Sequence, residues 1–111
     1  MLDQPMLWWQ ALGLFVAHFA GWEQDWQASI GDDALERKRV HAVRSAAVNV
    51  GAVRLADSAS ALEAWLLARQ AGAAGDDAEA LRRQLLADFR LSWQAAADAW
   101  KANSPAPGGS A

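Results

Sequence analysis

The stretch that decides the fold is residues 33–52, which read DALERKRVHAVRSAAVNVGA. Asp33 and Glu36 stand three residues apart, as in the capping box that begins many helices. Apolar residues then recur at helical spacing, and a glycine, the residue type that most often ends a helix, follows Val50. The stretch therefore predicts a helix that runs to about Val50.

Three further segments with helical periodicity lie on either side of this helix. Their apolar residues repeat at steps of three and four over about residues 10–30, 54–71 and 76–101. A short extra helix is expected near residues 3–7. All three connections between the long helices are short, and short connections place neighbouring helices antiparallel. We therefore expect an all-α protein, an antiparallel up-down-up-down four-helix bundle with a short extra N-terminal helix.

The length and composition of the chain fit one domain. Of its 111 residues, 1–102 are expected to form the bundle, whereas 103–111 are small, polar or proline and are expected to be a disordered tail. The absence of cysteine excludes a disulfide scaffold, a thiolate metal site and a cysteine nucleophile. The seven tryptophans mostly lie on the apolar stripes of the helices, so core packing is their expected role.

Positive charge is concentrated in one part of a chain whose net charge is −3. Residues 1–36 carry six acids and no base, whereas residues 37–54 carry five bases and no acid. Such an island in an acidic protein indicates one anion-facing surface. No basic residue precedes Arg37, so no secretory leader is visible, and the longest apolar run near the start is too short to span a bilayer. The expected location is the cytoplasm.

His41 lies on the face of the 33–50 helix opposite its apolar stripe. The residues four and three before it and three after it are all cationic, and like charges this close repel unless an anion occupies the surface. Small and apolar residues follow on the same face, and positive charge beside an apolar spot suits a docking surface. The residues predicted to dock a partner beside His41 and Arg44 are Arg37, Lys38, Ser45, Val48 and Ala52.

Residues 41–52, HAVRSAAVNVGA, resemble the signature of histidine phosphotransfer (HPt) domains. That family has a histidine, a basic residue at +3, a glycine or small residue at +4, further small residues, and a glycine at +10. Its fold is a four-helix bundle with the histidine on the second long helix, so the resemblance covers roughly residues 2–100. Two positions depart from the usual pattern: Arg44 stands where lysine is usual, and Ser45 stands where glycine is usual.

The resemblance implies a phosphocarrier of a multistep two-component phosphorelay. His41 would accept a phosphoryl group from a receiver-domain aspartate and pass it to a response-regulator aspartate, while Arg44 neutralises charge on that group. The partners would be receiver domains of a hybrid histidine kinase and of a response regulator, with no nucleic acid and no direct membrane contact. The family implies no ATP site, no enzyme activity and no cofactor of the domain's own, and Mg²⁺ would come with the receiver.

The resemblance also gives the domain a setting and leaves several alternatives open. Such domains often form the last module of hybrid sensor kinases, at the cytoplasmic end of a membrane protein. A bundle that docks partners without phosphorylation is the main alternative, and Ser45 is the best argument for it. An enzyme is disfavoured because the sequence has neither a Glu-x-x-His pair nor a glycine-rich phosphate loop followed by lysine. A nucleic-acid binder is disfavoured by the acidic net charge.

Helix geometry places Glu63, on the next helix, at the same height as His41. His41 lies ten residues before Gly51 and Glu63 lies ten residues after Val53, so both are about 15 Å from the intervening turn. Glu63 would then reach one ring nitrogen and orient the imidazole; the other interpretation is an ordinary surface glutamate. His18, the second histidine, is interpreted as a half-buried or surface residue of the first helix.

Overall fold

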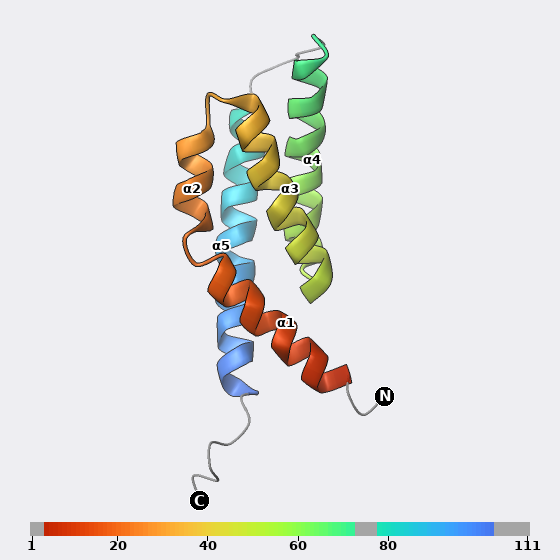
Figure 1. The fold of residues 1–111 in the computed structure, drawn as a ribbon, viewed down its shortest axis with the longest axis vertical. Helices are drawn as coiled ribbons and strands as arrows, with labels where there is room; N and C mark the ends of the chain where they lie inside the picture. Colours follow the sequence, from red (N-terminus) through yellow and green to blue (C-terminus); the bar gives the residue numbers. More distant parts are fainter. Residues whose placement is uncertain (1–3, 73–77, 104–111) are drawn as a thin grey trace, which may run out of the picture.

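The computed structural model describes residues 4–72 and 78–103, and these residues form helices without any strand. The helices are packed along one another (Figure 1), with α1 slanting across one end of the others. None of the helices in the described ranges has the length and apolar character needed to cross a membrane. The helices are α1 (Gln4–His18), α2 (Trp22–Ser29), α3 (Asp33–Val50), α4 (Val53–Gln70) and α5 (Glu79–Ala102).

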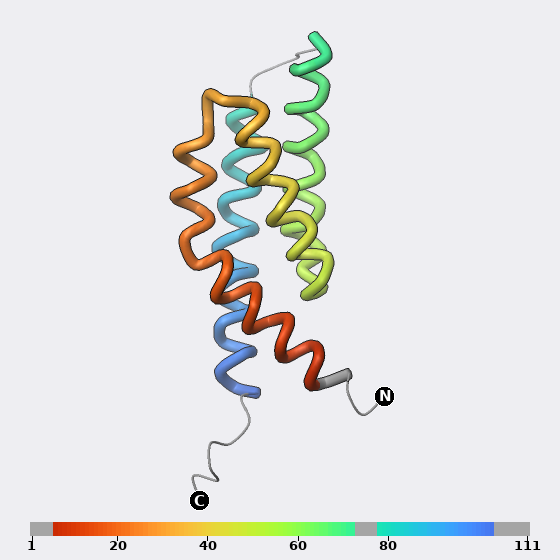
Figure 2. The backbone as a smooth tube through the Cα atoms, viewed as in Figure 1, coloured from red at the N-terminus to blue at the C-terminus, as the bar shows by residue number. Residues whose placement is uncertain are grey.

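The expected helix over residues 10–30 is wrong, because the chain turns at Phe19–Gly21 and divides this segment into α1 and α2. Figure 2 shows the change of direction between the two helices. Gly21 costs a helix about 1 kcal/mol relative to alanine, so a break there is cheap. The apolar spacing continues across the break, since Phe15 and Trp22 are both buried. Spacing alone therefore predicted one continuous helix.

The extra N-terminal helix expected near residues 3–7 is also wrong as a separate element. Residues 4–7 form the first turn of α1, which continues without a break to His18. The expected tail and the expected start of the last helix at Asp76 and Asp77 lie outside the described residues, apart from Asn103, which follows α5 directly.

Helix α3 has nearly the bounds that the sequence predicts. Its N-cap is Asp32, one residue before the expected Asp33, and the Asp32 carboxylate accepts a hydrogen bond from the Leu35 backbone N–H at 3.1 Å. At the other end, Gly51 has φ 77°, a left-handed conformation that glycine adopts at no steric cost. This cap lets α4 turn back alongside α3, which fixes how residues of the two helices face each other.

The core is built from the inner faces of all five helices. Trp22 and Trp26 are buried and stack with their ring centroids 5.1 Å apart. Trp8 is 44% exposed, so the expectation of core packing does not hold for every tryptophan. The fully buried aliphatic side chains come mainly from α3, α4 and α5 and include Val40, Val43, Leu55, Leu62, Leu66 and Leu85.

A buried carboxylate joins α2, α3 and α5. Glu36 is 0% exposed and accepts two hydrogen bonds at 2.8 Å from the guanidinium of Arg82. The indole N–H of Trp26 donates a third at 3.1 Å. A charge removed from water in this way is stable only while its partners remain, so this cluster holds the three helices in one arrangement.

Replacing Arg82 by methionine is expected to lower the free energy of unfolding by about 3 kcal/mol, because it leaves the Glu36 carboxylate buried without its counterion. Urea unfolding followed by tryptophan fluorescence measures the change. Arg83→Met, on the exposed side of the same turn, is the control and is expected to leave the midpoint nearly unchanged. Equal midpoints for the two variants would contradict the importance of this ion pair.

Candidate functional site

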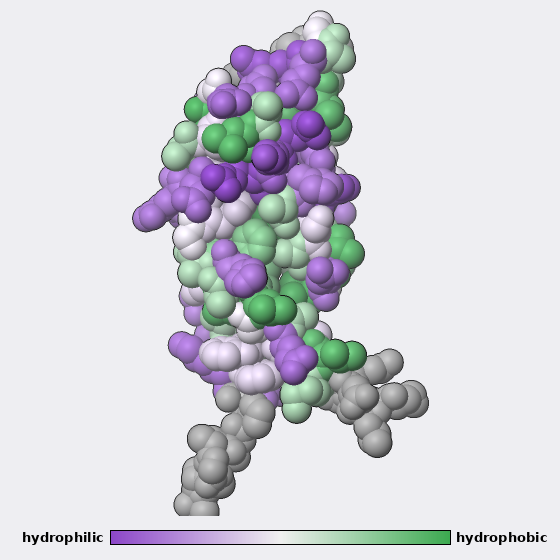
Figure 3. Space-filling model, viewed as in Figure 1, coloured by the Kyte–Doolittle hydropathy of each residue, from purple (hydrophilic) through white to green (hydrophobic). Residues whose placement is uncertain are grey.

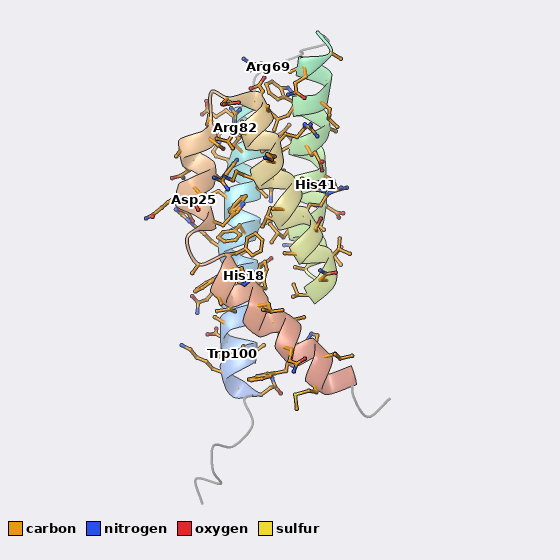
Figure 4. The ribbon with its side chains drawn as sticks, viewed as in Figure 1. His18, Asp25, His41, Arg69, Arg82 and Trp100 are labelled. Atoms are coloured by element: carbon orange, nitrogen blue, oxygen red, sulfur yellow. The ribbon has the colours of Figure 1, made fainter. Side chains whose placement is uncertain are left out.

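His41 lies near the middle of α3, and its side chain is 54% exposed. The preceding residue, Val40, and the residue two positions later, Val43, are completely buried, so the helix is anchored on both sides of the histidine. The label in Figure 4 places His41 where α3 lies beside α4. A ring on a fixed helix with half its surface in water can meet a second molecule without any rearrangement of the backbone.

Glu63 on α4 holds the ring of His41 from one side. Its Oε2 lies 2.9 Å from His41 Nδ1, and its side chain is only 11% exposed. The predicted contact is therefore present, and the interpretation of Glu63 as an ordinary surface residue is wrong. A carboxylate can only accept hydrogen bonds, so this contact requires the proton to be on Nδ1, with the Nδ1–H donating a hydrogen bond to Glu63.

The hydrogen bond from Nδ1 determines the state of the other ring nitrogen, Nε2. A neutral imidazole with its proton on Nδ1 has its lone pair on Nε2. Among the described residues, no hydrogen bond to Nε2 of His41 is found. In this tautomer the half-exposed ring carries on Nε2 a lone pair with nucleophilic character.

Arg44 lies one turn after His41 and pairs with Glu63 instead of reaching over Nε2. Its Nε is 3.0 Å from Glu63 Oε1, an ion pair without the alignment of a hydrogen bond. Its Nη2 is 3.2 Å from His41 Nδ1, on the same side of the ring as Glu63. A guanidinium can only donate, so with the Nδ1 proton directed at Glu63 this approach is a close contact and not a hydrogen bond. The observed role of Arg44 is therefore to balance the charge of a nearly buried carboxylate.

The predicted docking residues fall into two groups. Arg37 and Lys38 line a groove of about 700 Å³ together with His41. Val48 and Ala52 line a separate cavity of about 180 Å³ at the turn between α3 and α4. Ser45 is exposed on α3 between the two groups.

Sequence reasoning missed most of the groove beside His41. We call this groove the α2–α3 groove. One wall is α3; the other is α2 with the preceding turn. The signal that could have revealed it is Gly21, whose break redirects the chain before α2. The lining residues that were not predicted include His18, Phe19, Trp22, Asp25, Leu35 and Arg39.

Sequence reasoning also missed Val53 as part of the apolar surface at the α3–α4 turn. Val53 is 68% exposed and Val48 is 65% exposed, and both line the small cavity there. The signal was present in the sequence, because Val53 follows the glycine that ends α3.

The described residues contain no group of three or more histidine and acidic side chains that could hold a metal ion. Comparisons with known proteins add no further assignment: no family model, no curated protein and no solved structure matches the chain. What is known of the chemistry of the site therefore comes from His41, Glu63 and their neighbours.

Removing the carboxylate of Glu63 is expected to let the neutral His41 ring adopt both tautomers. In the unmodified protein, ¹⁵N spectra of the neutral His41 ring should show a protonated Nδ1 and an unprotonated Nε2. In Glu63→Ala the two nitrogens should become more alike, as both tautomers are populated. Asp57→Ala removes an exposed acid from the same helix and should not alter the spectrum. A protonated Nε2 in the unmodified protein would contradict the assigned hydrogen bond.

Proposed function

We propose that the protein is a histidine phosphotransfer domain of a multistep phosphorelay. His41 accepts a phosphoryl group from the aspartyl-phosphate of a receiver domain and passes it to the aspartate of a response regulator. The observation that carries this proposal is the hydrogen bond between His41 Nδ1 and Glu63, which leaves Nε2 of the half-exposed ring free to attack phosphorus.

The phosphoryl group moves by direct attack of the ring on phosphorus, with the receiver aspartate as the leaving group. The lone pair of His41 Nε2 attacks phosphorus, an N–P bond forms, and the P–O bond breaks so that the receiver aspartate leaves as a carboxylate. Positive charge develops on the ring during attack, and Glu63 stabilises it by accepting the Nδ1–H hydrogen bond. The step reverses when the aspartate of the second receiver attacks phosphorus and the ring leaves as a neutral imidazole.

Nearby cations support the charge of the transferring group. Lys38 is exposed and Arg37 half-exposed, and both lie in the groove that His41 borders. Arg44 is already engaged by Glu63, so its side chain assists directly only if it leaves that ion pair. Mg²⁺ bound to the receiver would supply further neutralisation.

The proposal also covers the arrangement of the helices and the place where the domain works. The helices form an antiparallel four-helix bundle in which α1 and α2 together take the place of the first helix. The chain reversal at Gly51 and the packing of α3 on α4 and of α4 on α5 support this arrangement. The domain works in the cytoplasm as a phosphocarrier without an ATP site, either alone or as a module of a hybrid sensor kinase.

A bundle that binds partners without phosphorylation is the second candidate. It is favoured by the apolar surface at the α3–α4 turn, where Val48 and Val53 are both more than half exposed. That surface does not include His41, so a partner could be held there whatever the chemistry of the ring.

Phosphoramidate, a small phosphoryl donor, tests the proposed function without knowledge of the natural partner. The protein should acquire one phosphoryl group that is labile to acid and stable to alkali, as expected for an N–P bond. His41→Gln should abolish the modification, and His18→Gln, which removes the other histidine, should retain it. The same variants can then be incubated with phosphorylated receiver domains. Modification that survives His41→Gln would contradict the proposal.

Glu63 is expected to act as a positioning residue for this reaction. Glu63→Ala should slow phosphorylation by phosphoramidate by about tenfold, since a hydrogen bond to a charged group is worth roughly 1 to 2 kcal/mol more than one to a neutral group. Glu63→Gln retains an acceptor oxygen and should recover part of the rate. If Glu63→Ala reacts at the original rate and keeps the same nitrogen phosphorylated, Glu63 has only a structural role.

A further inference from the structure

The α2–α3 groove combines a positive rim with an apolar floor. Phe19 and Leu35 contribute apolar surface, and the Trp22 ring lies at the base, where its indole N–H donates to the Arg39 carbonyl at 2.9 Å. This hydrogen bond joins α2 to α3 beside the groove. Figure 4 labels three residues around it, with His18 at the end of α1, Asp25 on α2 and His41 on α3.

The positive charge of the rim is not balanced by the protein. Arg37, Lys38 and Arg39 line the groove, and none of them is in an ion pair within the described ranges. The Nε of Arg37 is also shielded from solvent without a hydrogen-bond acceptor. In Figure 3, hydrophilic residues form a band across this face of the molecule, with hydrophobic residues on either side. Such an arrangement favours the binding of an anion.

The acids of the groove do not remove this excess. Glu63 lines the groove but is neutralised by Arg44, which leaves Asp25 as the one other acid in the lining. Three cations therefore face one unpaired carboxylate. A volume of about 700 Å³ lies within the range of small-molecule sites, which are mostly apolar with a few orienting polar groups.

We infer that the α2–α3 groove is a binding site for a small organic anion with an aromatic or aliphatic body, such as an aryl phosphate or carboxylate. Its charged group pairs with the rim cations and its apolar body lies over Phe19, Leu35 and the edge of Trp22. Because His41 borders the same groove, the bound anion covers the ring and excludes a phosphoryl donor. The binding of the anion follows from the groove alone, whereas its competition with a phosphoryl donor rests on the proposed function.

The test uses the full chain with phenyl phosphate as the probe, and with inorganic phosphate and phenol as its two halves. Two-dimensional NMR follows the indole N–H of Trp22 and the ring signals of His41. Both should shift together and saturate with phenyl phosphate, at an affinity at least about tenfold above that of either half, because charge and apolar contact act at one place. Saturation by phenol or by inorganic phosphate at equal concentrations would overturn the inference.

Matched charge variants separate the groove from general attraction to a cationic surface. Substituting glutamine for Arg37, Lys38 and Arg39 together should weaken phenyl phosphate binding at least tenfold, an order-of-magnitude expectation for losing charge-assisted hydrogen bonds. The control replaces three cations outside the groove, Arg54, Arg83 and Lys101, and should bind normally. Leu35→Ser is a milder variant that should remove the advantage of phenyl phosphate over inorganic phosphate. Unchanged binding in the groove variants would refute the site.

A competition measurement tests the regulatory part separately. Phenyl phosphate should slow the phosphorylation of His41 by phosphoramidate with the same concentration dependence as its binding. His41→Gln should still bind phenyl phosphate, because the rim and floor of the groove are intact. If the protein binds the probe but is never phosphorylated, the proposed function fails and the site remains; if phosphorylation is unaffected at saturation, the competition is refuted.

Discussion

The hydrogen bond from His41 Nδ1 to Glu63 is the interaction on which the proposed chemistry of this protein depends. It crosses from α3 to α4 at 2.9 Å, and it decides which ring nitrogen carries a proton and which keeps a lone pair. The contact exists only because the two residues are at matching heights on neighbouring helices. That register is set at Gly51, whose left-handed conformation ends α3 and returns the chain as α4.

The nearly buried carboxylate imposes a cost that its neighbours offset. Glu63 would be unfavourable so far from water without a cation, and Arg44 supplies one at 3.0 Å. An arginine three residues after His41 could equally have extended into solvent beside Nε2. Arg44, one turn from His41, thus holds the carboxylate that contacts the ring.

The parts of the fold that follow from local chemistry could be predicted, and the parts that depend on packing could not. The bounds of α3 follow from an acidic N-cap and a terminal glycine, and the Glu63 contact follows from equal distances to one turn. The break at Gly21 was missed because the apolar positions of α1 and α2 remain in phase across it. The α2–α3 groove was missed for the same reason, since it exists only where α2 departs from the line of α1. The pairing of Arg44 with Glu63 depends on a side-chain conformation that spacing does not specify.

The most direct test of the central claim is to locate the phosphoryl group on the ring after treatment with phosphoramidate. Protein labelled with ¹⁵N in its histidines shows a one-bond coupling between phosphorus and the nitrogen that carries it. We expect this coupling at Nε2 of His41, with the Nδ1 proton retained and hydrogen-bonded to Glu63. Coupling at Nδ1 of His41, or at either nitrogen of His18, would contradict the assignment of the nucleophile.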